Sequence, residues 1–164
     1  MRKKQQEYDE LGNIVSEVTI QYVNKVKHKD MVSVTSSKSI YDILKSIFDP
    51  NTIQLKEYFY AIYLNRSNKI LAVKKISEGG IAGTVVDLKE LITTQFLLKE
   101  SCRLNSTALI VAHNHPSGNP KPSQQDISMT KNIKQGLGLF NISLLDHIIV
   151  TADGYCSFSD EGLI

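Results

Sequence analysis

The sequence predicts an α/β fold in which strands and helices alternate within one layered domain. Residues 107–112 are almost all apolar, as in a strand that is buried on both faces of a sheet. Before and after this segment, apolar residues recur three and four positions apart, which is the period of a helix with one buried face. A chain of 164 residues can bury one hydrophobic core that combines these elements.

Composition argues against several classes of protein. The chain is 41% hydrophobic and 22% charged, which is ordinary for a folded globular protein. A net charge of +2 and a pI near 8.4 do not indicate nucleic-acid binding, which normally requires a concentrated basic surface. No apolar run approaches the length of a membrane span, and the charged N-terminus does not resemble a signal peptide. We therefore expect a cytoplasmic protein with no membrane partner. The spacing of Cys102 and Cys156 indicates no metal binding, and we assign them no chemistry.

Residues 1–36 are expected to form an extension or arm ahead of a domain that spans residues 37–164. The beginning of this extension is polar and charged, as in a frayed terminus. Over residues 14–26, β-branched side chains partly alternate with polar ones, which predicts an edge strand. Such a strand could pair with a second copy of the chain in a homo-oligomer.

The domain is predicted to begin with a helix and a hairpin. From Ser37, apolar residues at helical spacing run to Ile47, and Asp49-Pro50 is expected to end the helix. Residues 58–64 and 70–73 are rich in aromatic, apolar and β-branched side chains. The polar turn between these two segments completes a pattern that is typical of a β-hairpin.

Two more helices and a final hairpin are predicted in the rest of the chain. They comprise a second helix over 87–104, a third helix from Ser123 to about Gln135, and strands over 144–150 and 155–158. Asp87 is expected to cap the second helix, and Gly136 with Gly138 is expected to end the third. Asp153-Gly154 is a turn signal between the last two strands.

Candidate metal ligands follow the buried strand. His113 and His115 are two residues apart, so in extended backbone their side chains project to the same side and could share one metal ion. Asp126 comes after the loop 116–122, in which three prolines restrict the backbone and one glycine permits a sharp bend. Two imidazole nitrogens and one carboxylate oxygen suit Zn²⁺, and three protein ligands leave the fourth tetrahedral position open for water. We therefore expect one catalytic zinc ion per chain.

The same residues also have simpler explanations. Most His-x-His pairs do not bind a metal, and a surface histidine is usually a solvated side chain. Ser123 and Asp126 form a pattern like a capping box, in which the serine caps a helix and the aspartate lies near the positive end of the helix dipole. The joint pattern of two histidines, a constrained loop, a serine and an aspartate favours a metal site, and capping is compatible with it.

Residues 112–127 and 144–150 closely resemble the RadC-like branch of the JAB/MPN superfamily, which carries the JAMM metalloprotease motif. The first segment reads AHNHPSGNPKPSQQDI, and the second reads LLDHIIV. The resemblance covers about residues 37–164. It implies a JAB/MPN-like mixed sheet flanked by helices, also described as cytidine-deaminase-like, and a zinc ion bound by His113, His115 and Asp126.

The resemblance also implies two catalytic groups. Ser123 would help to steady the reacting carbonyl group, and a glutamate on an upstream strand would act as general base. We assign the second role to Glu57, at the start of the first hairpin strand. Glu90 is the alternative, but the helix dipole already explains a carboxylate in the first turn of a helix. Asp146 and His147 also match the family's pattern, and we expect them to pack or to support the ligands rather than to bind the metal.

The leading functional hypothesis is a metallopeptidase-like enzyme that hydrolyses a peptide or isopeptide bond in a peptide or protein substrate. A non-catalytic interaction module is one alternative, because the MPN superfamily includes such members. A DNA-repair or mobile-element accessory protein is another. It follows from the name of the RadC-like group and finds no support in the charge of this chain.

Overall fold

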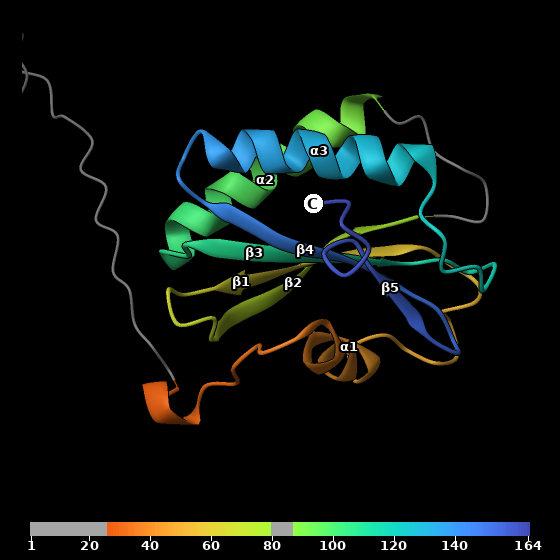
Figure 1. Ribbon diagram of the computed structural model, residues 1–164, viewed down its shortest axis with the longest axis horizontal. Coiled ribbons are helices and arrows are strands. Elements are labelled where there is room, and N and C mark those ends of the chain that lie inside the picture. Colours follow the sequence, from red (N-terminus) through yellow and green to blue (C-terminus); the bar gives the residue numbers. More distant parts are fainter. Residues whose placement is uncertain (1–25, 80–86) are drawn as a thin grey trace, which may run out of the picture.

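The computed structural model describes residues 26–79 and 87–164, including the side chains of all these residues except 87–93. Within these ranges, a five-stranded mixed sheet has helices on both faces (Figure 1), which confirms the predicted α/β class. The strands are β1 Tyr58–Leu64, β2 Ile70–Glu78, β3 Ala108–Asn114, β4 Ser143–Val150 and β5 Tyr155–Ser157. Their order is β2-β1-β3-β4-β5; β3 and β4 are parallel, and the other neighbours are antiparallel.

Three α-helices cover the sheet in the described part of the chain. α1, Ser37–Lys45, lies on one face, and α2, Asp87–Leu104, lies with α3, Gln124–Gly138, on the other (Figure 1). α1 begins where predicted, because the Ser36 hydroxyl accepts a hydrogen bond from the Ser39 amide. It is shorter than predicted, since the apolar positions up to Ile47 continue in a turn. None of the described helices is long and apolar enough to cross a bilayer.

Two apolar cores lie on opposite faces of the sheet. One is enclosed between the sheet and α1, and the other between the sheet and the pair α2 and α3. β3 contributes to both, because its side chains alternate between the faces. Ile110 belongs to the core under α1, whereas Leu109 and Val111 belong to the core under α3. This double burial explains the uninterrupted apolar run and directs His113, two residues after Val111, toward α3.

The N-terminal extension is described only from residue 26. The strand predicted over 14–26 therefore lies almost entirely outside the described residues, and pairing of two chains through it stays a prediction. The Val34 amide donates a hydrogen bond to the Asn68 carbonyl at 2.9 Å. The Ile70 amide donates to the Val32 carbonyl, also at 2.9 Å. These bonds attach the described end of the extension to the hairpin of β1 and β2.

The boundaries of α2 and α3 also differ from the prediction. Gly136 does not end the third helix: α3 continues to Gly138, its last residue, and its C-cap is Leu139. A β-carbon on Gly136 would lie 2.6 Å from the Thr94 Cγ2 atom, so glycine at this position permits the close contact of α3 with α2. Asp87 is the first helical residue of α2 rather than the residue before it, and its side chain lies outside the described residues.

Gly136→Ala is expected to lower the free energy of unfolding by about 1–3 kcal/mol, because the added methyl group meets a β-branched side chain with little rotamer freedom. Gly138→Ala is the matched control. Its β-carbon would meet no described atom within 4 Å, so this change should stabilise α3 by about 0.5–1 kcal/mol. Denaturant unfolding measures both effects. Adding Thr94→Ser to Gly136→Ala should recover most of the loss; if it does not, this contact is not the cause.

Candidate metal centre

A buried asparagine holds the end of β3 in place. Asn114 is the last residue of the strand and is fully buried. Its side-chain nitrogen donates to two carbonyl groups of the segment before β1, at 2.6 and 2.8 Å, and its oxygen accepts from the Tyr58 amide at 2.8 Å. These bonds tie the start of β1 to the end of β3. Because side chains alternate along a strand, His113 and His115 project to the opposite face, toward α3.

Three side chains converge beside this strand end. His113 lies near the end of β3, His115 directly follows this strand, and Asp126 lies in the first turn of α3. The two Nε2 atoms lie 2.9 Å apart, His113 Nε2 lies 3.3 Å from Asp126 Oδ1, and His115 Nε2 lies 3.5 Å from Asp126 Oδ2. One ligand atom from each residue lies within 4.8 Å of the others, so the group can hold a metal ion. All three residues predicted as ligands are thus together.

The spacing of these atoms fits a small tetrahedral cation. Ligand atoms that are about 2.0–2.1 Å from a tetrahedral ion lie about 3.3–3.4 Å from each other. His113 Nε2 lies near this distance from His115 Nε2 and from Asp126 Oδ1, at 2.9 and 3.3 Å, whereas His115 Nε2 lies 3.5 Å from the other carboxylate oxygen, Oδ2. The chemistry of the donors fits as well, because two imidazole nitrogens and one carboxylate oxygen are a common ligand set for zinc.

Hydrogen bonds to the other polar atoms of His115 and Asp126 leave His115 Nε2 and Asp126 Oδ1 with lone pairs that are free to bind a metal ion. His115 Nδ1 lies 2.7 Å from the Asn119 carbonyl oxygen, which can only accept. Nδ1 of the neutral ring therefore carries the proton, and Nε2 has the lone pair. In Asp126, Oδ2 accepts from the amide and the hydroxyl of Ser123, at 2.7 and 2.6 Å, while Oδ1 faces His113. Lone pairs and a carboxylate at these distances repel one another, and a bound cation relieves that repulsion.

The charge of Asp126 is stabilised despite burial. Only 6% of the residue is exposed, and burial alone would raise the pKa of its carboxyl group. Hydrogen bonds from the His113 and His115 rings, when these are protonated on Nε2, and from the Ser123 hydroxyl outweigh burial and hold the pKa of Asp126 well below its usual range. In turn, the Asp126 carboxylate raises the pKa of His115 against the effect of burial. The centre therefore attracts positive charge, whether as a proton or as a metal ion.

Ser123 occupies the predicted place before α3. Its hydroxyl accepts from the Asp126 amide at 3.1 Å, and the Asp126 carboxylate accepts from the Ser123 amide, so both halves of a capping box are present. Capping and the candidate metal centre thus use the same two residues. The catalytic role of Ser123 stays a prediction; its side chain is exposed beside the carboxylate to which it donates.

Glu57 immediately precedes β1 and is exposed. β1 and β3 are antiparallel with Phe59 opposite His113, so continuing this register by two residues places Glu57 opposite His115. Residues directly opposite each other on antiparallel strands share a face of the sheet. The ligand carboxylate raises the pKa of His115 most, and the charge of Glu57 adds a smaller contribution in the same direction. The side chain of Glu90, the alternative base, lies outside the described residues.

Further polar side chains lie behind the ligands. His147, in β4, is fully buried, and its Nε2 atom lies 2.7 Å from His113 Nδ1. Burial lowers the pKa of His147, so its ring is neutral. Its Nδ1 atom lies 2.6 Å from the Thr130 hydroxyl. Thr130 was not predicted from the sequence, where its one signal is its position a helical turn after Asp126. The Asp146 carboxylate accepts from the Ser157 hydroxyl and from the amides of His147 and Ser159.

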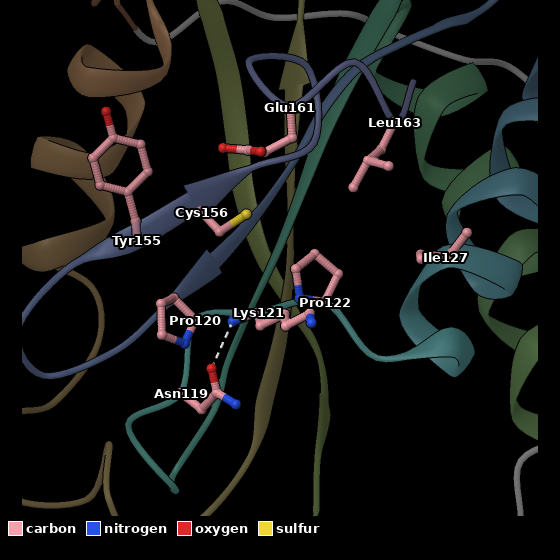
Figure 2. A pocket seen from close by; sticks show the side chains of 9 residues that line it. All are labelled: Asn119, Pro120, Lys121, Pro122, Ile127, Tyr155, Cys156, Glu161 and Leu163. Carbon is pink, nitrogen blue, oxygen red and sulfur yellow. Dashed lines mark hydrogen bonds between the residues drawn. The ribbon is translucent and has the colours of Figure 1, made fainter.

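A pocket of about 500 Å³ opens next to the loop between β3 and α3 (Figure 2). Its walls are the proline-rich loop, the first turn of α3, β5 and the C-terminal residues, namely Asn119, Pro120, Lys121, Pro122, Ile127, Tyr155, Cys156, Glu161 and Leu163. Most of these side chains are apolar. The pocket adjoins the centre, because the Asn119 carbonyl binds His115 and Ile127 directly follows Asp126.

Comparison with known proteins finds sequences similar to most of the chain. A family model described as the RadC-like JAB domain matches residues 34–163. A UPF0758 protein of Flavobacterium johnsoniae is 39% identical over 130 residues, which cover 79% of this chain and 53% of that protein. A UPF0758 protein of Neisseria meningitidis serogroup B is 41% identical over 108 residues, which cover 66% and 45%. The chain thus spans about half the length of these curated relatives.

Asp126→Asn is expected to weaken zinc binding by more than about a hundredfold, whereas Ser123→Ala should weaken it by about tenfold, because the first removes a charged ligand and the second only a group that supports it. Ser123→Ala should also lower the free energy of unfolding by about 1 kcal/mol through the lost cap. Competition with a chelator measures the affinities. His113→Ala with His115→Ala is the zinc-free control and should stay folded. Unchanged zinc affinity in both single variants would mean that these residues only cap α3.

Proposed function

The chain belongs to the family of RadC-like JAB domains, and from this premise we propose that it is a zinc-dependent hydrolase of peptide or isopeptide bonds. The observation that carries the proposal is the convergence of His113 Nε2, His115 Nε2 and Asp126 Oδ1, with separations of 2.9 and 3.3 Å from His113 Nε2. Three protein ligands leave one position for water, as in catalytic zinc sites. The choice of an amide substrate rests on the JAMM-type motif.

Glu57 is the proposed general base. When bound, zinc supplies Lewis acidity, which activates a water molecule and polarises a carbonyl group. The Glu57 carboxylate would accept a proton from the attacking water and pass it to the leaving amine nitrogen as the carbon–nitrogen bond breaks. Two observations support this role: the strand register sets Glu57 opposite His115, and the side chain is exposed, so it can reach a substrate.

Ser123 is the proposed stabiliser of the oxyanion. Its hydroxyl donates to Asp126 Oδ2 at 2.6 Å, which holds the side chain beside the centre. Rotation of the hydroxyl proton away from Asp126 would let the same group donate to the oxygen of a reacting carbonyl, where negative charge develops. The amide of Ser123 would still hold the carboxylate, at 2.7 Å, during this rotation.

The pocket beside the loop supports a polypeptide substrate. A polypeptide carries side chains close to its scissile amide, and this pocket has the volume and the apolar walls to accept one of them. The loop that forms one wall also positions His115, and the helix that forms another begins at the Ser123 cap. We propose that the pocket binds an apolar side chain near the scissile bond.

Zinc analysis combined with a substrate screen tests the proposal. Elemental analysis should find about one zinc ion per chain. A library of peptides and isopeptide-linked peptides is then incubated with the zinc-loaded protein, with and without a chelator. Cleavage that stops with the chelator and returns with added zinc is the expected result. A zinc-loaded chain that cleaves nothing would favour a non-catalytic interaction module, and salt-dependent binding to DNA would favour a DNA-associated role.

Glu57→Gln should retain zinc but lose turnover by at least about a hundredfold, because glutamine cannot accept the proton of the attacking water. Glu90→Gln is the control and should change turnover little. Steady-state kinetics on a substrate from the screen, with zinc content measured for each variant, provide the comparison. If Glu90→Gln causes the larger loss, the base has been assigned to the wrong glutamate.

Leu163→Trp should lower kcat/KM by about tenfold or more for substrates with a large apolar side chain near the scissile bond, because the indole narrows the pocket. Zinc content should not change, since Leu163 lies on the wall formed by the C-terminal residues. Leu139→Trp, at an 84% exposed position after α3, is the matched control. Equal losses for substrates with glycine at the same position would argue against a side-chain pocket.

A further inference from the structure

A chain of hydrogen bonds runs from the backbone of α3 to the candidate metal centre. The Thr130 hydroxyl lies 2.6 Å from the Asp126 carbonyl oxygen and 2.6 Å from His147 Nδ1. His147 Nε2 lies 2.7 Å from His113 Nδ1, and His113 Nε2 faces the other ligands. Thr130, His147 and His113 are all buried, so water does not compete for these bonds.

The Thr130 hydroxyl, the first group in this series of hydrogen bonds, determines which atom donates in each of the others. A carbonyl oxygen cannot donate, so the one proton of the Thr130 hydroxyl points to Asp126. The hydroxyl oxygen must then accept from His147, which places the proton of His147 on Nδ1. The His147 ring is fully buried and meets a hydroxyl and a second imidazole rather than a carboxylate, so it is neutral and its Nε2 is an acceptor.

The hydrogen bond between His147 and His113 determines the tautomer of His113. Since His147 Nε2 accepts, His113 Nδ1 donates, and the lone pair of the neutral His113 ring lies on Nε2. We infer that Thr130 and His147 are positioning residues that hold His113 in the tautomer able to bind a metal ion. This inference rests on the metal centre of the proposed function but not on hydrolytic activity.

The opposite tautomer of His113 is a real competitor. It would place a proton on Nε2, which lies 3.3 Å from Asp126 Oδ1 and 2.9 Å from His115 Nε2. Both neighbours can accept, so this proton would occupy the position of the metal ion. The hydrogen-bond chain opposes that state, because His113 Nδ1 and His147 Nε2 would then present two lone pairs to each other at 2.7 Å.

The tautomers can be observed directly in the full chain. Two-dimensional NMR of protein labelled with ¹⁵N-histidine, without added metal, correlates each ring nitrogen with the ring protons and reports which nitrogen is protonated. We expect His147 and His113 to be protonated at Nδ1. Protonation of His147 at Nε2 overturns the inference, whatever the protein binds or cleaves.

Thr130→Val tests the effect on metal binding. Valine keeps the size of threonine but removes the acceptor of His147 Nδ1, so His147 should change tautomer and shift the proton of His113 to Nε2. Competition with a chelator should show a zinc dissociation constant about 10–100-fold higher than that of the wild type, the range for residues that support metal ligands. The NMR spectrum should show the changed tautomers. Thr130→Ser restores the hydroxyl and should restore zinc affinity.

Ser101→Ala is the matched control for the lost helix hydroxyl. Like Thr130, Ser101 is buried and donates to the carbonyl four residues earlier, at 2.7 Å to Leu97, but its bond lies within α2. It should lose stability without losing zinc affinity. A Thr130→Val protein whose zinc affinity stays within about twofold of the wild type overturns the inference. A wild-type chain that binds zinc but cleaves nothing counts against the hydrolase proposal alone.

Discussion

Strand β3 lies in the middle of the sheet with all of its residues buried, so each side chain has to enter one of the two cores or the centre at its end. The alternation sends Val111 and then His113 toward α3, and sends Asn114 to the other face, where it ties β3 to the start of β1. A one-residue shift of register would exchange the faces and turn His113 away from Asp126. The strand pairing that builds the cores therefore also positions the candidate metal centre.

Helix α3 contributes Asp126 to the candidate centre, and this residue makes three separate interactions. The Asp126 carboxylate caps the helix with Ser123 and faces the two histidines, and its carbonyl anchors the Thr130 hydroxyl. The helix dipole favours this charge in the first turn and offsets part of the cost of its burial. His147, which supports His113 from behind, is buried, whereas Glu57 is exposed. The proposed hydrolysis needs this division, because ligands must be rigid while substrate and water need access.

Much of this arrangement can be predicted from the sequence because it depends on neighbouring residues. The apolar period identifies the strands and helices, the two histidines share a face through the geometry of an extended chain, and the cap at Ser123 spans only a few residues. The prediction that Gly136 ends a helix is wrong because it, too, used only neighbouring residues. A glycine has the same local pattern whether it ends a helix or lets two helices touch, and only the position of Thr94 separates these cases.

Contacts between distant segments carry no such local signal. In the sequence, nothing distinguishes Thr130 from other helical threonines. The parallel pairing of β3 with β4 places His147 between Thr130 and His113. The antiparallel register of β1 and β3, continued past the ends of both strands, sets Glu57 opposite His115. The sequence by itself therefore determined the elements, the ligand types and the cap, which depend on the period of the chain over a few residues. The tertiary structure alone decided the tautomer of His113 and the placement of the proposed base, because both depend on which strands pair and in which register.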